Sequence, residues 1–227
     1  TLQELGRLEE AEESYKQAIA LKSDYIDAHN NLGITLQKLR RLDKAEISYT
    51  QAIELNPEYA EARNNLGLTL QELGKLGEAE ASLTQAIVLK PDYAEAHYNL
   101  GVILQELGRL DEAKASYRQA IALKPDYGDS HNNLGNTLLA LGRLERAEAR
   151  YKRATVLKPD FTIGYRNLGS LFQELGELER SKIAYRLMLK STSEPVSETN
   201  RPPVTALIPF GRSGSLFFHS LIDGHPD

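Results

Sequence analysis

The sequence is organised by a repeat of 34 residues. The tripeptide Asn-Leu-Gly occurs five times, and other columns keep the same period. Its glycines are Gly33, Gly67, Gly101, Gly135 and Gly169. Alanines follow at Ala45, Ala79, Ala113 and Ala147, then at Ala52, Ala86, Ala120 and Ala154, and prolines at Pro57, Pro91, Pro125 and Pro159. A period of this length is typical of an array of supersecondary units, each of which buries its apolar face against the next.

Each period predicts two helices. In residues 94–127 apolar side chains recur at helical spacing on both sides of Gly108, and Pro125 stops the second helix because its ring cannot continue the hydrogen-bond ladder. We expect Asp92 and Asp111 to cap the two helices. Glycine and alanine leave room for two helix axes to approach. We expect the bulky column to fill the seam between hairpins, and its members are Tyr49, Leu83, Tyr117 and Tyr151.

This pattern resembles the tetratricopeptide repeat family, a helix–turn–helix unit of this length with small-residue and proline columns. The resemblance implies an all-α fold, a right-handed superhelical solenoid of hairpins. The expected repeats are residues 26–59, 60–93, 94–127 and 128–161, with 1–25 as a partial repeat and 162–190 as a degenerate terminal one. The last repeat has Ser181, Met188 and Ser193 in place of Ala, Ala and Pro, as terminal repeats commonly drift. We interpret the chain as a fragment of a longer array.

Composition excludes several other classes. The net charge is −5 with acids and bases mixed along the chain, so we expect no nucleic-acid partner. No apolar run is long enough for a membrane span, and the absence of cysteine favours a reducing, cytoplasmic location. His29, His97 and His131 share one repeat column, but they lie on different hairpins without a second ligand type, so we expect packing and no metal site.

In this family the first helix of each hairpin lines a concave groove, which implies a protein or extended-peptide partner. The groove columns here carry asparagines: Asn31, Asn65, Asn99, Asn133 and Asn167, with Asn30, Asn64 and Asn132 beside them. A carboxamide both donates to and accepts from a peptide backbone, so this column predicts sequence-tolerant peptide binding. It is similar to the repeat arm of O-linked N-acetylglucosamine transferases. The alternative is that each asparagine bonds a neighbouring hairpin and is structural.

Two further groove columns are acidic or neutral. They are Asp27, Glu61, Glu95 and Asp129, and Gln37, Gln71, Gln105 and Gln173. The Lys and Arg residues that would clamp a C-terminal carboxylate are missing from most of these positions. We therefore expect a neutral or basic extended segment as the partner.

The C-terminal part of the sequence has a different pattern. Residues 191–203 read as a linker, and residues 204–227 as a strand, a small-residue loop and a short helix. The loop is Gly211, Arg212, Ser213, Gly214 and Ser215. Such a loop before a helix N-terminus points amides at a phosphate. It resembles the phosphosulfate loop of sulfotransferases, which implies 3′-phosphoadenosine 5′-phosphosulfate (PAPS) as the cofactor of a longer protein.

Three hypotheses follow. The chain is an interaction scaffold, or the substrate-recruiting arm of a bacterial PAPS-dependent sulfotransferase, or the arm of an O-GlcNAc-transferase-like glycosyltransferase. The segment 204–227 is too short to hold a 3′-phosphate site and an acceptor pocket. We therefore expect no catalysis and no cofactor in this fragment itself.

Overall fold

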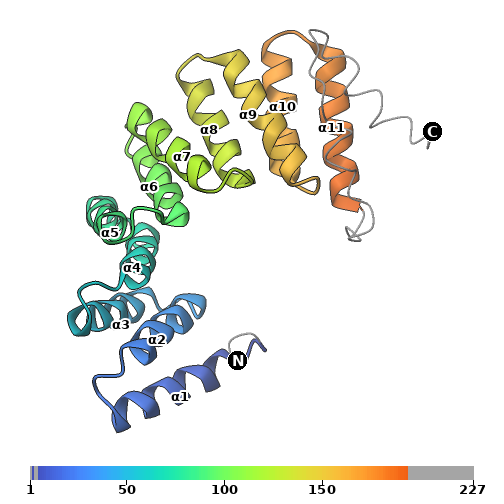
Figure 1. The fold of residues 1–227 in the computed structure, drawn as a ribbon. Coiled ribbons are helices and arrows are strands. Elements are labelled where there is room, and N and C mark those ends of the chain that lie inside the picture. Colours follow the sequence, from blue (N-terminus) through green and yellow to red (C-terminus); the bar gives the residue numbers. More distant parts are fainter. Residues whose placement is uncertain (1, 3–4, 194–227) are drawn as a thin grey trace. The chain divides into compact units, whose positions relative to one another are not determined.

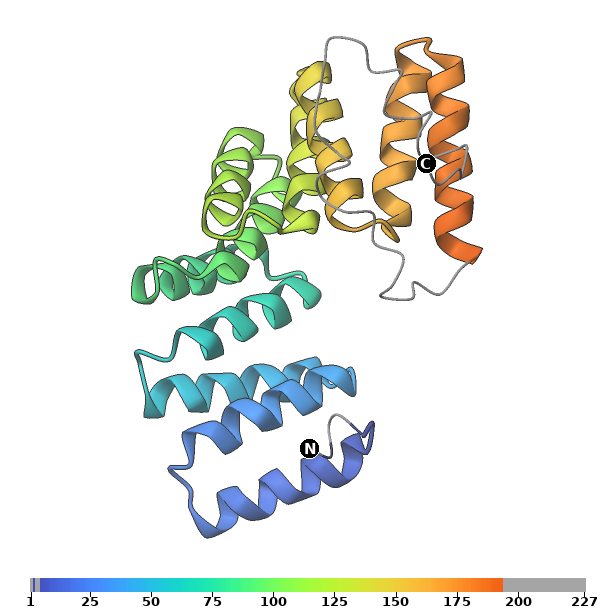
Figure 2. The same cartoon turned by 45° about the vertical axis from the view of Figure 1, so that its right-hand side comes forward.

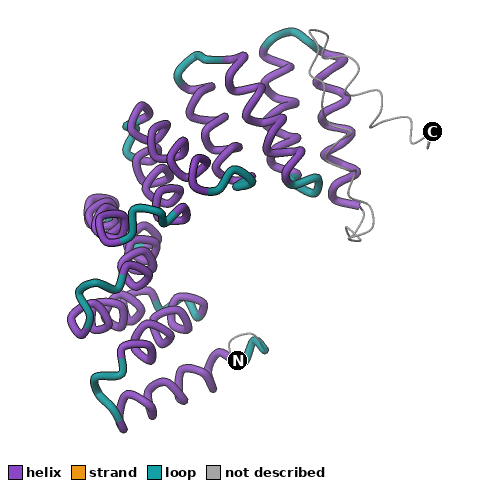
Figure 3. The backbone as a smooth tube through the Cα atoms, viewed as in Figure 1, coloured by secondary structure: helices purple, strands orange, loops and turns teal. Residues whose placement is uncertain are grey.

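The computed structural model describes residue 2 and residues 5–193, and within this part helices joined by short loops are the regular structure (Figures 1 and 3). The helices are α1 (Leu8–Leu21), α2 (Ile26–Lys38), α3 (Leu42–Leu55), α4 (Ala60–Glu72), α5 (Leu76–Leu89), α6 (Ala94–Glu106), α7 (Leu110–Leu123), α8 (Gly128–Ala140), α9 (Leu144–Leu157), α10 (Thr162–Glu174) and α11 (Leu178–Ser193). The all-α prediction is confirmed. Helix α11 includes residues 191–193, which the sequence assigned to the linker; the rest of the predicted linker and the segment 204–227 lie outside the described residues.

The chain divides into two compact units, Thr1–Pro125 and Asp126–Asp227. In the first unit α2 pairs with α3, α4 with α5 and α6 with α7, and α1, α3 and α5 also pack on α2, α4 and α6 respectively (Figures 1 and 2). The first helices touch as well, because α4 lies against both α2 and α6. In the second unit α8 pairs with α9, α10 pairs with α11, and α9 packs on α10. Each unit is thus a stack of helical hairpins.

The first helices end in a turn that requires a left-handed residue. After α4, Gly74 has φ +75°, its N–H donates to the carbonyl of Gln71 at 2.9 Å, and the Lys75 N–H donates to the carbonyl of Leu70 at 2.9 Å. This pair of bonds satisfies the last carbonyls of the helix and reverses the chain. Gly108 and Gly142 repeat the geometry, while Arg40 takes the same conformation in the first hairpin at φ 59°.

The predicted helix caps are wrong. Helix α6 begins at Ala94 with Tyr93 in the cap position, and no side chain caps it. The Tyr93 N–H bonds the carbonyl of Lys90 at 3.1 Å and its ring lies under the Lys90 ammonium, so a backbone turn sets this helix start and leaves Asp92 outside it. Helix α7 begins at Leu110, which places Asp111 within its first turn. There the carboxylate still favours the positive end of the helix dipole.

The small-residue columns mark close contacts between the two helices of one hairpin. A Cβ atom built on Gly33 would lie 2.6 Å from the ring of Tyr49, and one on Gly67 would lie 2.7 Å from Leu83. Ala45 on α3 is fully buried in the same seam, and Ala52 on α3 is fully buried as well. The predicted steric role of these columns is confirmed. The expected place of the bulky column is corrected, since it fills the space within a hairpin.

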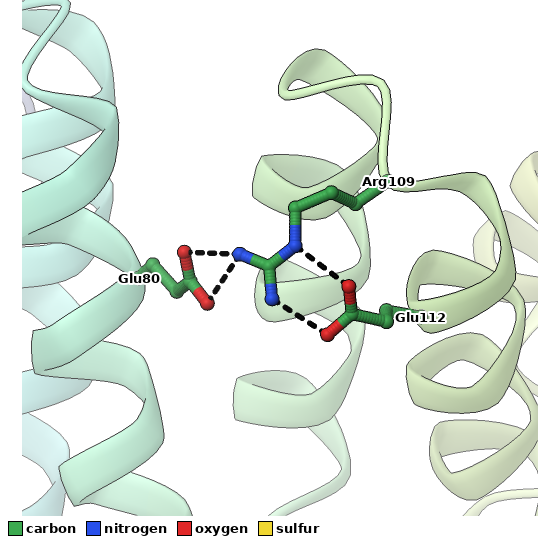
Figure 4. A network of polar contacts seen from close by, with 3 residues as sticks. All are labelled: Glu80, Arg109 and Glu112. Carbon is green, nitrogen blue, oxygen red and sulfur yellow. Dashed lines mark hydrogen bonds and ion pairs between the residues drawn. The ribbon is translucent and has the colours of Figure 1, made fainter.

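Ion pairs tie successive second helices together. The Arg109 guanidinium at the start of α7 donates through Nη1 to both carboxylate oxygens of Glu80 on α5 at 2.7 Å, and through Nε and Nη2 to Glu112 on its own helix (Figure 4). These bonds raise the pKa of Arg109 and lower that of Glu112. Lys75 makes the equivalent pair with Glu46 at 2.8 Å. Exposed pairs of this kind contribute little to stability, and each one links two adjacent hairpins.

The second unit contains a more buried ionic cluster. Glu148 on α9 accepts from Lys152 at 2.8 Å and from Arg180 on α11, whose guanidinium lies 3.9 Å from the ring centroid of Phe172. Ser181, which departs from the alanine column, donates to the carbonyl of Gly169 at 2.9 Å. The drift of the last repeat therefore has a local explanation, because the buried hydroxyl has a partner.

Candidate functional site

The first helices present one set of side chains at matching positions. On α2 these are Asp27, Asn30, Ile34 and Gln37, spaced three and four residues apart and so on one face of the helix. The corresponding residues are Glu61, Asn64, Leu68 and Gln71 on α4, and Glu95, Tyr98, Val102 and Gln105 on α6. We call these residues, with Asn31, Asn65, Asn99 and the helix-end residues Lys38, Glu72 and Glu106, the first-helix face of the first unit. Bonds between neighbouring helices run along it.

The asparagines of this face bond one another. Asn65 Nδ2 donates to Asn30 Oδ1 at 3.3 Å, and Asn99 Nδ2 donates to Asn64 Oδ1 at 2.8 Å. In the second unit Asn167 Nδ2 donates to Asn132 Oδ1 at 3.0 Å. Within each unit the column is therefore a chain of carboxamides in which a hairpin holds the one before it.

The expected exposure of the asparagines is corrected by this arrangement. Four of them are buried, namely Asn30, Asn64, Asn99 and Asn132, and four are half-buried, namely Asn31, Asn65, Asn133 and Asn167. Six of the eight bond a carboxamide of the adjacent hairpin, as the structural alternative supposed. The contacts with neighbouring hairpins exist in both units, and peptide binding by the same residues stays a proposal.

The bonds within the column do not use its full capacity. A carboxamide offers two N–H donors and two acceptor lone pairs. Asn65 gives one N–H to Asn30 and accepts one bond from Asn64 Nδ2 at 3.4 Å. Both bonds are at the long end of the range and are correspondingly weak. One donor and one lone pair of this half-buried side chain are left for another group.

The acidic column is neutralised to a greater extent than the sequence suggested. Glu61 pairs with Lys90 at 2.8 Å, and the hydrogen bond from this ammonium holds the pKa of Glu61 below its usual value. The same pairing recurs where the cation lies 29 residues after the acid, in Glu95 with Lys124 at 3.2 Å and in Asp129 with Lys158 at 2.5 Å. The lysines at the ends of the second helices therefore compensate most of the charge.

The histidine column has a structural role. His29 Nε2 lies 2.9 Å from the carbonyl oxygen of Ser23, and His97 Nε2 lies 3.0 Å from that of Pro91. Arg63, at the same position of its hairpin, donates to the carbonyl of Pro57 at 3.0 Å. Each side chain ties a first helix to the loop before it. Among the residues that the structure describes, no group of three or more His, Cys, Asp or Glu could hold a metal ion.

The apolar residues of the face were not predicted from the sequence. Ile34, Leu68 and Val102 are half-buried, one on each first helix, and Tyr98 lies one turn before Val102. The recurrence of an aliphatic residue every 34 positions, at Ile34, Leu68 and Val102, was the sequence signal that could have identified this row. The predicted phosphate loop, Gly211 to Ser215, lies outside the described residues. No helix in the described part is long and apolar enough to cross a membrane.

Stacked helical hairpins of constant length, closed by a glycine against a tyrosine or leucine, define a tetratricopeptide-repeat protein. Within that class the chain belongs to the family described as the cilia and flagella-associated protein 70 C-terminal domain, whose model matches residues 2–207. Among curated proteins none matches the sequence.

Several solved structures share the fold. MamA is 25% identical with a TM-score of 0.65, over 71% of this chain and 94% of that one. YrrB, described as a TPR protein with an unusual peptide-binding site, is 19% identical with a TM-score of 0.64, over 81% of this chain and 94% of that one. PilF of Pseudomonas aeruginosa is 20% identical with a TM-score of 0.69, over 75% and 78% of the two chains.

Proposed function

We propose that this chain is a protein-interaction scaffold and that its first-helix face binds an extended segment of a partner protein. The tetratricopeptide fold is generally such a scaffold and is typically non-catalytic. The observation that carries the proposal is the chain of linked carboxamides. Its members are already oriented by their neighbours, yet Asn65 keeps a donor and an acceptor.

An extended segment suits these groups because its backbone is not paired internally. Each partner residue offers one N–H and one carbonyl. The oxygen of a carboxamide can accept from this N–H while its NH₂ group donates to the carbonyl. The contacts do not depend on the side chains of the partner. Orientation by Asn30 and Asn64 also reduces the entropy lost on binding, since the side chain is held before the peptide arrives. The printed description of YrrB, a protein of the same fold, adds support by analogy.

Selection of peptides tests the proposal. A random peptide library displayed on phage is panned against the chain, and an enriched peptide is then used in hydrogen–deuterium exchange. On binding we expect slower amide exchange in α2, α4 and α6. The exchange rates of α3, α5 and α7 should change little. Slower exchange confined to the second helices, or no enrichment above an unrelated helical protein, would contradict the proposal.

The C-terminal segment suggests a second role. Arg212, Ser213, Gly214 and Ser215 support a PAPS-binding loop, and the family match ends at residue 207, before this loop. The array would then recruit substrates for a sulfotransferase. The asparagine column also fits the arm of a glycosyltransferase, but the loop favours the sulfotransferase of the two. Calorimetric titration of 3′-phosphoadenosine 5′-phosphate into the full-length natural protein tests this. Binding that is lost in Arg212→Ala supports it, and no binding contradicts it.

A further inference from the structure

The apolar residues of the first-helix face form a row across three helices. Ile34, Leu68 and Val102 lie midway along α2, α4 and α6, each half-buried. Ile34 packs with its inner side on the core around Leu36 and leaves its outer side on the face. Aliphatic side chains that repeat once per hairpin offer a partner one apolar contact per hairpin, so the distance between hairpins sets the spacing of side chains that the partner should carry.

That spacing distinguishes between two extended conformations. Helices in contact, as α2 with α4 and α4 with α6, have axes about 8–10 Å apart. A β-strand returns a side chain to the same side every second residue, after about 6.6–6.8 Å. A polyproline II segment returns one every third residue, after about 9.3 Å, and leaves its backbone groups unpaired. The row matches the polyproline II repeat. Tyr98 adds an aromatic ring of the kind that such segments dock on.

Charge on the same face gives a second, independent feature. Glu61 and Glu95 pair with Lys90 and Lys124, and Glu72 pairs with Arg40. Two carboxylates of this face have no cation within ion-pair distance among the residues that the structure describes. They are Asp27, whose contact is with the Tyr59 hydroxyl at 3.4 Å, and Glu106, which accepts from the Gln71 amide at 2.6 Å.

The sequence explains both gaps in the pairing. Asn56 stands where the other hairpins have lysine, and its Oδ1 accepts from the Glu58 N–H at 3.1 Å instead of pairing with Asp27. Gly74 stands at the position that Arg40 occupies one hairpin earlier, so Glu106 has no equivalent guanidinium. Asp27 lies in the first turn of α2 and Glu106 at the end of α6. The two uncompensated charges are therefore at opposite corners of the face.

We propose that the first-helix face of the first unit selects a polyproline II segment with an aliphatic side chain at every third residue and Lys or Arg at both ends. The inference rests on the proposed function and adds the partner class to it. Asp27 lies about 10 Å from Ile34 along the helix axis and Glu106 about 6 Å from Val102, at 1.5 Å per residue. Flanking basic residues of a segment that covers the apolar row can reach both carboxylates.

Two synthetic peptides of identical composition test the spacing. The first is Lys-Pro-Val-Pro-Pro-Val-Pro-Pro-Val-Pro-Lys, and the second, Lys-Pro-Pro-Val-Pro-Val-Pro-Val-Pro-Pro-Lys, has its valines at alternate positions. Both carry fluorescein and are titrated into the chain. We expect the first to bind about tenfold more tightly, since only it places every valine on the row. Added salt should weaken it, because the end contacts are exposed charges.

Variants separate the charge contribution from general effects. The double variant Asp27→Asn, Glu106→Gln should remove most of the salt dependence. The matched double variant Glu9→Gln, Glu54→Gln, which changes two exposed acids outside the face, should bind as the wild type does. Equal salt dependence in the two double variants would overturn the charge part of the inference.

The failures of the two proposals are distinguishable. If both peptides bind equally and Leu68→Ser weakens both, the spacing inference is wrong and binding at the face stands. If neither binds while library-selected peptides protect α2, α4 and α6 from exchange, the polyproline II inference is wrong and the proposed function stands. If peptide binding is unchanged in a folded Leu68→Ser variant, both proposals are contradicted.

Discussion

Gly101 of α6 and the ring of Tyr117 of α7 are in direct contact. A Cβ atom at residue 101 would lie 2.7 Å from Cδ1 and Cε1 of Tyr117, closer than real Cβ atoms approach another group. The same relationship joins Gly135 to Tyr151 at 2.6 Å. The hairpin therefore closes only because the first helix has no side chain at this point, which gives the Asn-Leu-Gly repeat a steric cause.

Replacing Gly101 by alanine should destabilise the protein even though alanine is the better helix former. Overfilling a close contact costs about 1–3 kcal/mol of the free energy of unfolding. The matched control is Gly77→Ala on α5, where nothing lies within 4 Å of an added Cβ. This change should stabilise by about 0.5–1 kcal/mol. Urea denaturation followed by circular dichroism measures both, and a shift of the same sign in the two variants would refute the steric account.

Asn99→Ala should lower stability more than Asn65→Ala. Loss of the Asn99 amide leaves the buried Asn64 Oδ1 without its donor at 2.8 Å, which costs about 1–3 kcal/mol. Asn65 is half-buried and its bonds are longer, at 3.3 and 3.4 Å, so water can replace them at smaller cost. Thermal unfolding compares the two variants. Equal melting temperatures would show that the column does not hold the hairpins together.

Glu148 should make part of the stability depend on pH. Burial acts to raise the pKa of Glu148, but bonds from Lys152 and Arg180 outweigh it and the net shift is downward. A carboxyl group whose pKa is lower in the folded state stabilises fully above its unfolded pKa and loses this contribution as the pH falls through the folded value. Unfolding between pH 7 and pH 3 should therefore be less steeply pH-dependent in Glu148→Gln.

The loss of stability in Glu148→Gln at neutral pH gives a further check on the role of Glu148. Hydrogen bonds to a charged group contribute about 1.5–3 kcal/mol, so Glu148→Gln should be destabilised by about this amount at pH 7 and converge with the wild type in acid. Lys152 and Arg180 remain in the variant and lose the Glu148 charge, while Arg180 keeps its ion pair with Glu177. Parallel stability curves for the two proteins over this pH range would disprove the role of the ionic cluster.

Asn56→Lys should complete the ion-pair column of the first hairpin. The new ammonium would take the place that Lys90 and Lys124 have beside Glu61 and Glu95 and would pair with Asp27. Stability should change by less than about 1 kcal/mol, as for other exposed pairs. Affinity for a lysine-flanked peptide should fall about threefold, since one of the two free carboxylates is then occupied. Unchanged affinity in a fluorescence titration would argue against Asp27 as a contact.

The fold was largely predictable because one period sets many positions at once. Glycine, alanine and proline columns that recur together leave few arrangements other than a stack of hairpins. The helix caps were mispredicted because Asp92 looks like a local cap, whereas a backbone turn from Lys90 to Tyr93 sets the start of α6. Local capping rules describe isolated helices better than a helix entered from a fixed turn.

The candidate site was less predictable because its properties arise between hairpins. One repeat does not show that Asn99 reaches Asn64, or that Lys90 neutralises Glu61, since these pairs are 35 and 29 residues apart. The unneutralised Asp27 and Glu106 are visible only when complete and incomplete pairs are compared. The apolar row was not predicted because the aliphatic residues of a helix are first assigned to the core of the protein.

The central claim is that the first-helix face binds an extended partner segment, and calorimetry with matched variants tests it most directly. A library-selected peptide is titrated into the wild type, into Leu68→Ser on α4 and into Val88→Ser on α5, where Val88 is 65% exposed. Both changes remove one aliphatic side chain, and circular dichroism checks that both variants remain helical. The account predicts weakened binding in Leu68→Ser and wild-type binding in Val88→Ser. Equal affinity of the peptide for both folded variants would contradict it.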